Sequence, residues 1–441
     1  MSILAYLNPS RPSLLLSTLA ALGSLLAPLS AAALTDYERD QITFMKEEEK
    51  LARDVYTTLG ETWDLAVFTN IARSEQTHMD RMDTLLTTYA LPDPAQPAIG
   101  VFTNPVLQHL YDRLVAAGSV SARAALGVGE MIEITDINDL TDLIAGTNLA
   151  DVQLTADRLR NASYNHLAAF RAALDALPPL ATPTTDGQLT NLSVRGPLGS
   201  GDESLIVGFI ISGDTPLRVL LTTRGPSLDA FGVTATASDP AIELFQGSTT
   251  IAANDNGLSA LDPALLAAHQ IFPLAPTDAA LIVDLAPGAY TVVASNQGTG
   301  RNGLAEIYAL PTADQTARLI NLSARGKTEP GDGRLIAGFI LGGSEPLPLL
   351  VRALGPTLTD FAVSGAAVDL DLELHTANNT SPLAVSDWLN PEVLGTVSSD
   401  HWPQTPLEPL TLQNLGPGAI TVHALDPLGD GGIALIDVTI Y

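Results

Sequence analysis

The second half of the chain repeats itself at a fixed offset. The segment NLSVRG at residue 191 returns as NLSARG at residue 321, and LIVGFI at 205 returns as LIAGFI at 335, so that both pairs lie 130 positions apart. Solenoid repeats have periods of about 20 to 50 residues, so a period this long indicates duplication of a whole domain. We therefore predict two tandem domains of one fold.

Each copy alternates short apolar runs with turns rich in Gly, Pro, Asp or Asn, and neither copy has sustained helical periodicity. This pattern predicts two all-β, sandwich-like repeats, at residues 189–310 and 317–441. A linker rich in Pro and Thr precedes them, at residues 178–188. The repeats resemble β-rich modules at the carboxyl ends of secreted and surface proteins of environmental bacteria, and that resemblance implies no activity.

Two features of the β repeats bear on metal binding. Calcium in the acidic turns at 201–202 and 331–332 is a less favoured alternative, since such turns are more commonly plain turns. The histidines of the repeats lack the spacing of metal ligands, and we expect structural roles for all of them: His269, His375, His401 and His423.

The first 33 residues have the pattern of a secretory signal peptide. Arg11 precedes the apolar run SLLLSTLAALGSLLAPL, and Ala31 and Ala33 provide small residues at cleavage-site spacing. A membrane anchor is the less favoured interpretation, because the run is short and contains Gly23 and Pro28. We expect a bacterial protein exported to the periplasm or the cell exterior, with no membrane span after the signal is removed.

Composition excludes several kinds of site and partner. The chain has no cysteine, which excludes disulfides, thiolate metal sites and cysteine nucleophiles. Its formal net charge of −28 disfavours nucleic acid and favours cations.

Residues 34–177 show helical periodicity instead. A first helix is predicted from Thr35 to about Leu59, and its apolar face includes Glu49, whereas Glu47 and Glu48 are turned away from that face. A second helix at about 64–90 places Glu75 and His78 on one face with Met82 and Leu85, at spacings of three and four residues.

The later helices repeat this feature. A third long helix at about 121–135 aligns Glu133 and Asp136 with its apolar face, and a fourth at about 149–176 aligns Ser163 and His166 with Phe170. Burying three glutamates and two histidines without partners would be very unfavourable. Carboxylates and imidazoles from facing helices, with Glu and His at i and i+3, are how a four-helix bundle holds two iron or manganese ions. A metal centre is therefore predicted.

Five segments together resemble a bacterial ferritin-like family catalogued as domain of unknown function 2202. They are EEEKLARDVY at 47, NIARSEQTHMD at 70, FTNPVLQHLYDRLVAAG at 102, GVGEMIEITDINDL at 127 and NASYNHLAAF at 161. The resemblance covers residues 35–177 and implies a ferritin-like four-helix bundle. The predicted fold class is thus multidomain α plus β.

Carried over residue by residue, the resemblance implies a metal-ligand set of Glu49, Glu75, His78, Glu133 and His166. The fourth helix departs from the pattern of a full di-iron site. Ser163 stands where a second glutamate would lie three residues before the second histidine. Asp136, one turn after Glu133, is a candidate replacement.

A carboxylate-rich centre binds ferrous iron and reacts with dioxygen or peroxide, because hard oxygen ligands favour the ferric product. We therefore expect an exported metal-binding protein, with di-iron or di-manganese ferroxidase, oxidase or peroxide-scavenging chemistry. The alternative is a cell-surface or matrix binding protein that acts through the β repeats, with the helical bundle as a structural domain.

Overall fold

The computed structural model describes residues 34–178, 187–257, 263–269, 271–310, 316–376, 381–385, 393–403 and 407–441. The expected signal peptide and most of the linker lie outside these residues. The chain divides into two compact units, one comprising Met1–Leu180 with Leu389–His401 and the other Ala181–Trp388 with Trp402–Tyr441. We call the helices of the first the helical unit and the strands of the second the β unit.

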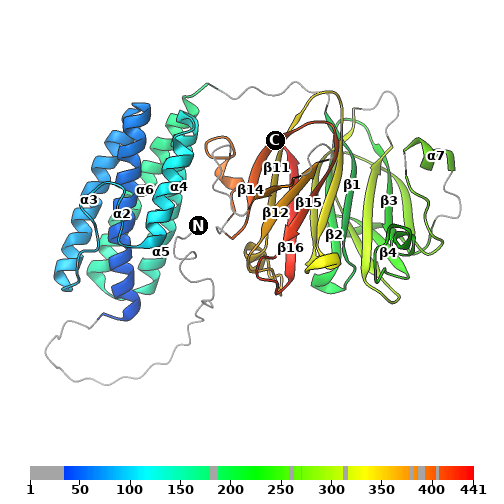
Figure 1. Ribbon diagram of the computed structural model, residues 1–441, viewed down its shortest axis with the longest axis horizontal. Coiled ribbons are helices and arrows are strands. Elements are labelled where there is room, and N and C mark those ends of the chain that lie inside the picture. Colours follow the sequence, from blue (N-terminus) through cyan, green and yellow to red (C-terminus); the bar gives the residue numbers. More distant parts are fainter. Residues whose placement is uncertain are drawn as a thin grey trace, which may run out of the picture. The chain divides into compact units, whose positions relative to one another are not determined.

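The helical unit contains five helices in its described residues, four long and one shorter (Figure 1). Their bounds are α2 (Asp36–Trp63), α3 (Ala66–Thr88), α4 (Pro105–Gly118), α5 (Ala122–Gly146) and α6 (Ala150–Asp175). All four predicted long helices are present. The third extends to Gly146 rather than to about residue 135, because its buried face continues through Asp139, Leu140 and Leu143.

Local sequence determines where these helices begin. Thr35 caps α2 in a capping box: its hydroxyl accepts from the Glu38 amide, and the Glu38 carboxylate accepts from the Thr35 amide. Asn104 caps α4, with Pro105 in the first turn, where a missing N–H has no cost.

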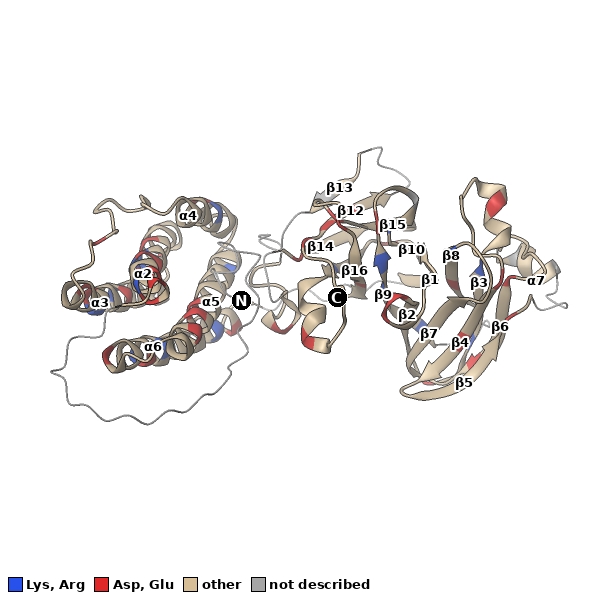
Figure 2. Ribbon diagram, turned by 90° about the horizontal axis from the view of Figure 1, so that it is seen from below, with Lys and Arg blue, Asp and Glu red and all other residues tan. Residues whose placement is uncertain are grey.

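The long helices pack so that their buried faces meet. Helix α2 contacts α3 and α5, and α6 contacts α5 and α3, with α4 against α2 and α5. Figure 2 views the helices nearly end on and shows the α2/α3 pair against the α5/α6 pair. The faces that carry the predicted ligands therefore meet inside the unit.

The β unit contains sixteen strands in its described residues, eight from each repeat, with the short helix α7 (Pro263–Ala268). The first repeat supplies β1 (Gln188–Pro197), β2 (Leu205–Ser212), β3 (Leu217–Arg224), β4 (Pro240–Gln246), β5 (Thr249–Asn254), β6 (Ala279–Leu285), β7 (Gly288–Asn296) and β8 (Asn302–Ala309). The second supplies β9 (Arg318–Thr328), β10 (Ile336–Gly342), β11 (Leu347–Leu354), β12 (Asp371–Thr376), β13 (Leu383–Val385), β14 (Leu410–Leu415), β15 (Gly418–Leu425) and β16 (Gly432–Ile440).

The two repeats pair their strands in the same way. In the first repeat the strand orders are β5-β4-β7-β2 and β1-β8-β3-β6, and in the second they are β13-β12-β15-β10 and β9-β16-β11-β14, with antiparallel neighbours throughout. The repeats then join edge to edge, because β1 pairs with β10 and β2 pairs with β9. One apolar core runs through both repeats.

The duplication extends to buried polar groups. The carboxylate of Asp278 accepts from the amide of Gly225 at 2.8 Å, and Glu408 accepts from Gly355 at 2.8 Å at the equivalent position of the second repeat. A Cβ at Gly225 would lie 1.9 Å from the carbonyl oxygen of Ala237, so glycine is required there.

No helix within the described ranges combines the length and apolar character needed to cross a bilayer.

Candidate metal centre

The five predicted ligands come together inside the helical unit. Glu49 comes from α2, Glu75 and His78 from α3, Glu133 from α5 and His166 from α6. The exposed fractions of these residues are 1% for Glu49, 2% for Glu75, His78 and Glu133, and 9% for His166. Ionisable groups buried to this extent require compensation by partners or by a bound ion.

Glu75 lies between the two histidines. Its Oε2 is 2.7 Å from Nδ1 of His78, and its Oε1 is 2.8 Å from Nδ1 of His166. The two imidazole rings stack with centroids 5.5 Å apart and planes 24° from parallel. One carboxylate therefore faces both imidazoles, each with a different oxygen.

A second carboxylate accompanies each histidine. Oε2 of Glu49 lies 3.0 Å from Nδ1 of His78, and Oε2 of Glu133 lies 3.5 Å from Nδ1 of His166. The result is two triads that share Glu75, and within each triad the ligand atoms lie within 4.8 Å of one another. Each triad offers two carboxylates and one imidazole, a donor set suited to iron or manganese.

Buried atoms without hydrogen bonds test whether these residues fit a metal pair. Oε1 of Glu49 is buried and has no hydrogen-bond partner among the described residues, and Oε1 of Glu75 and Nδ1 of His166 have only each other, 2.8 Å apart. An unsatisfied buried polar atom costs about 1–3 kcal/mol. Nε2 of His166 is meanwhile within 2.9 Å of the Ser74 hydroxyl, which orients the ring with Nδ1 toward the carboxylates. The donor atoms thus fit a pair of cations.

Ser163, which stands where a full di-iron site would have a second glutamate, contacts Asp136. The Ser163 hydroxyl donates to Oδ2 of Asp136 at 2.5 Å, while Oδ1 of Asp136 has no hydrogen-bond partner within the described part of the chain. Asp136 is only 6% exposed. It lies outside both triads, and a hydroxyl from α6 holds its carboxylate in place.

The carboxyl groups of the centre have opposite pKa shifts. Burial raises the pKa of Glu49 and that of Glu133 to about 7, although the neighbouring histidines oppose the effect. Burial also acts to raise the pKa of Glu75, but its contacts with His166 and His78 lower it to about 2. Burial raises the pKa of Asp136 well above its usual value, and the nearby carboxylates add to this.

The pKa values of the two imidazoles are raised, whereas burial alone would lower the pKa of a histidine. Burial acts to lower the pKa of His78, but Glu49 and Glu75 raise it to about 11. Burial likewise opposes protonation of His166, and Glu133 and Glu75 raise its pKa to about 10. Without metal, protons on the histidines balance part of the buried negative charge, so cations and protons compete for the same atoms.

Tyr56 belongs to the centre as well as to the apolar core. Its hydroxyl donates to Oε1 of Glu133 at 2.7 Å, and its ring packs 5.1 Å from that of Phe170 and 6.1 Å from that of Phe68. Sequence spacing indicates only that Tyr56 faces inward. Its contact with Glu133 depends on how α2 and α5 pack together.

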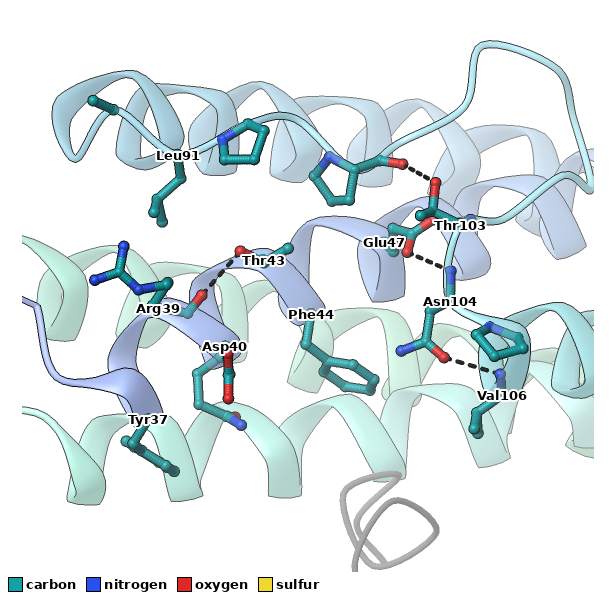
Figure 3. Close-up of a pocket in the computed structure, with 15 residues that line it drawn as sticks. Tyr37, Arg39, Asp40, Thr43, Phe44, Glu47, Leu91, Thr103, Asn104 and Val106 are labelled. Atoms are coloured by element: carbon teal, nitrogen blue, oxygen red, sulfur yellow. Dashed lines mark hydrogen bonds between the residues drawn. The ribbon is translucent and has the colours of Figure 1, made fainter.

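The prediction for Glu47 and Glu48 needs correction with respect to burial, since each is only 3% exposed. Glu47 accepts from the backbone amides of Thr103 at 2.6 Å and Asn104 at 2.9 Å (Figure 3). Burial, together with Asp139 and Asp136, raises the pKa of Glu48 well above its usual value. Helix α5 and the segment that connects α3 to α4 cover faces of α2 that hydrophobic periodicity assigns to solvent.

A pocket of ≈ 790 Å³ lies near the start of α2. Phe44, Leu91 and Val106 supply apolar walls, and Arg39 and Asp40 supply charge (Figure 3). None of the five predicted ligands lines this pocket. It is therefore separate from the buried carboxylate–histidine cluster.

Comparison with known proteins supports the family resemblance. The family model described as "Uncharacterized protein domain (DUF2202)" matches residues 38–178. The chain is 43% identical over 159 residues to "Uncharacterized protein MJ0754" of Methanocaldococcus jannaschii, covering 36% of this chain and 86% of that protein.

Two solved structures are similar to part of the chain. The crystal structure of hypothetical protein MJ0754 from Methanococcus jannaschii is 43% identical and covers 36% of this chain and 91% of that one, with a TM-score of 0.34. The crystal structure of a DUF305 fragment from Deinococcus radiodurans is 14% identical and covers 32% of this chain and 98% of that one, with a TM-score of 0.27.

The identity with MJ0754 extends over most of that protein's length, and the family model covers the same helices that carry the buried cluster. Through residues 38–178, the chain belongs to the DUF2202 family of uncharacterized protein domains.

Proposed function

We propose that the helical unit is a ferritin-like centre for two iron or manganese ions, with ferroxidase, oxidase or peroxide-scavenging activity. The observation that carries this proposal is the pair of buried triads sharing Glu75, in which two carboxylates crowd around each imidazole. Two triads with one common carboxylate are suited to two adjacent ions.

Each residue has a role that follows from its position. Glu75 would help to hold both ions, since its two oxygens face different imidazoles. Glu49 with His78 would hold one ion, and Glu133 with His166 the other. When bound, such ions supply one-electron steps that couple oxidation of ferrous iron to reduction of dioxygen or peroxide.

Neighbouring residues position these ligands. The Tyr56 hydroxyl engages one oxygen of Glu133 and leaves the other directed toward His166. The Ser74 hydroxyl holds Nε2 of His166, which presents Nδ1 to Glu75 and Glu133. Burial of the cluster limits access of bulk water and strengthens each electrostatic contact.

Oxygen consumption tests this proposal directly. The full chain would be loaded with ferrous iron without oxygen, then mixed with dioxygen or with hydrogen peroxide while ferric absorbance and oxygen are followed. We expect rapid iron oxidation by the wild-type protein and at least about a tenfold slower rate for Glu75→Gln, which removes the shared charge.

Glu61→Gln is the matched control, because Glu61 is an exposed residue on α2. It should oxidise iron at the wild-type rate. Equal rates for wild type and Glu75→Gln would refute a reactive centre at the two triads. Whether dioxygen or peroxide gives the faster reaction distinguishes an oxidase from a peroxide scavenger.

A further inference from the structure

A second group of metal-ligating side chains lies in the β unit. Glu373 and His375 are two residues apart on β12, so they point to the same side of the sheet. The antiparallel register of β12 and β15 pairs Glu373 with His423 and His375 with Thr421. Glu373 and His375 therefore occupy positions on one face next to His423, which lies about 50 residues further along the chain.

The side chains are in contact. The rings of His375 and His423 have centroids 4.4 Å apart, and Nε2 of His375 lies 3.3 Å from Oε2 of Glu373. One potential ligand atom from each residue lies within 4.8 Å of the others. All three residues are half-buried, so the cluster is accessible to an ion from solvent.

We propose that Glu373, His375 and His423 form a separate binding site for a borderline divalent transition metal of the zinc or copper class. Two imidazole nitrogens and one carboxylate oxygen are a donor set typical of such ions. The centre in the helical unit offers mostly carboxylates, so the two sites should differ in metal preference.

The first repeat provides a natural comparison. At the positions equivalent to Glu373, His375 and His423 it has Glu243, Phe245 and Val293. The register is the same, since Glu243 pairs with Val293 and Phe245 with Thr291. The fold thus forms this strand pair without imidazoles, which indicates that packing alone does not require the two histidines.

The surroundings of His423 bear on its availability as a ligand. Burial, together with His375 and Arg334, lowers the pKa of His423 to about 4, so its ring is neutral near pH 7. Nη1 of Arg334 lies 3.4 Å from Nδ1 of His423. The guanidinium has the same sign as a metal ion and should weaken binding; the equivalent residue of the first repeat is Ser204.

The test counts zinc bound by the metal-stripped full chain after equilibration with Zn²⁺ and removal of the free ion. The double variant His375→Phe, His423→Val copies the first repeat and should retain its fold. We expect it to bind about one zinc ion fewer per chain than wild type. Arg334→Ser should retain that ion and bind it roughly tenfold more tightly.

Further variants keep the test decisive. Glu75→Ala with His78→Ala should keep the zinc ion of the β unit, so loss at one site is distinguishable from loss at the other. If the double histidine variant does not fold, Glu373→Gln replaces it and should weaken zinc binding by at least about tenfold. Unchanged zinc content and affinity in the folded histidine or glutamate variant would overturn the proposal.

Discussion

At the scale of single residues, the unusual feature is Glu75, a carboxylate held between two imidazoles in the interior of a helical unit. The sequence spacing of Glu75 and His78 predicts that they share a face. It does not predict that each oxygen of Glu75 faces a different histidine, because that depends on the packing of α3 against α6. The packing of α5 against α6 likewise aligns Ser163 with Asp136.

The metal-free protein should lose stability as pH rises from 5 to 8. Burial raises the pKa of Glu49 and Glu133 to about 7. Their protonated forms therefore contribute fully to folding stability below about pH 4.5, and this contribution is lost as pH passes 7. The raised pKa values of His78 and His166, about 11 and 10, add stability below about pH 6.5 that is lost toward those values.

Urea unfolding followed by helical circular dichroism would measure this effect. We expect the free energy of unfolding to fall by on the order of 2 kcal/mol between pH 5 and 8. The slope should be smaller in the Glu49→Gln, Glu133→Gln variant. A wild-type stability that rises across this range would contradict the assignment.

Asp136→Asn tests whether Asp136 replaces the carboxylate missing at Ser163. The substitution preserves the shape of the side chain but leaves a group that cannot ionise when a cation binds beside it. We expect one of the two ions to bind at least about tenfold more weakly, because buried carboxylates contribute strongly to cation affinity. Stepwise titration with ferrous iron in the absence of oxygen would measure the two affinities. If both affinities are unchanged, Asp136 is not a ligand.

At the scale of elements, hydrophobic periodicity predicts the four long helices and places all five candidate ligands on their inward faces. It ends the third helix too early because the run from Thr135 to Asp139 is polar and β-branched in sequence, yet buried in the structure. It also gives no signal for the Glu373, His375 and His423 cluster, because their proximity depends on the register of β12 and β15.

Gly129→Ala should destabilise the helical unit despite improving helix propensity. Alanine gains about 1 kcal/mol over glycine in a helix. A Cβ at this position would lie 2.4 Å from the Phe170 ring, and overpacking of this kind costs about 1–3 kcal/mol. Displacement of Phe170 would also disturb Tyr56 and its contact with Glu133.

Thermal unfolding of the helical signal would measure the change. We expect a lower midpoint for Gly129→Ala and partial recovery when Phe170→Leu makes room for the new methyl group. If Gly129→Ala alone raises the midpoint, the Phe170 ring moves aside without a cost in stability.

At the scale of the whole molecule, the internal repeat predicts two copies of one β fold, and each copy pairs its strands in the same order. The repeat cannot predict that β1 joins β10 and β2 joins β9, because edge pairing depends on the arrangement of the copies rather than on either alone. These junctions cover strand edges that would otherwise be open.

Removal of the second repeat should therefore cause self-association. A chain ending at residue 310 would expose the edges of β1 and β2, which pair with the second repeat in the full chain. We expect dimers or larger species by light scattering, with the full chain as the control. A stable monomer of the truncated chain would contradict this expectation.

The most direct test of the central claim is the metal content of the chain. Protein purified from cells grown with iron and manganese would be analysed by plasma mass spectrometry, beside the Glu75→Ala, His78→Ala variant and with iron, manganese and zinc counted separately. Our account predicts about two iron or manganese ions per wild-type chain and their loss in the variant. A folded wild-type protein that binds neither iron nor manganese would contradict it.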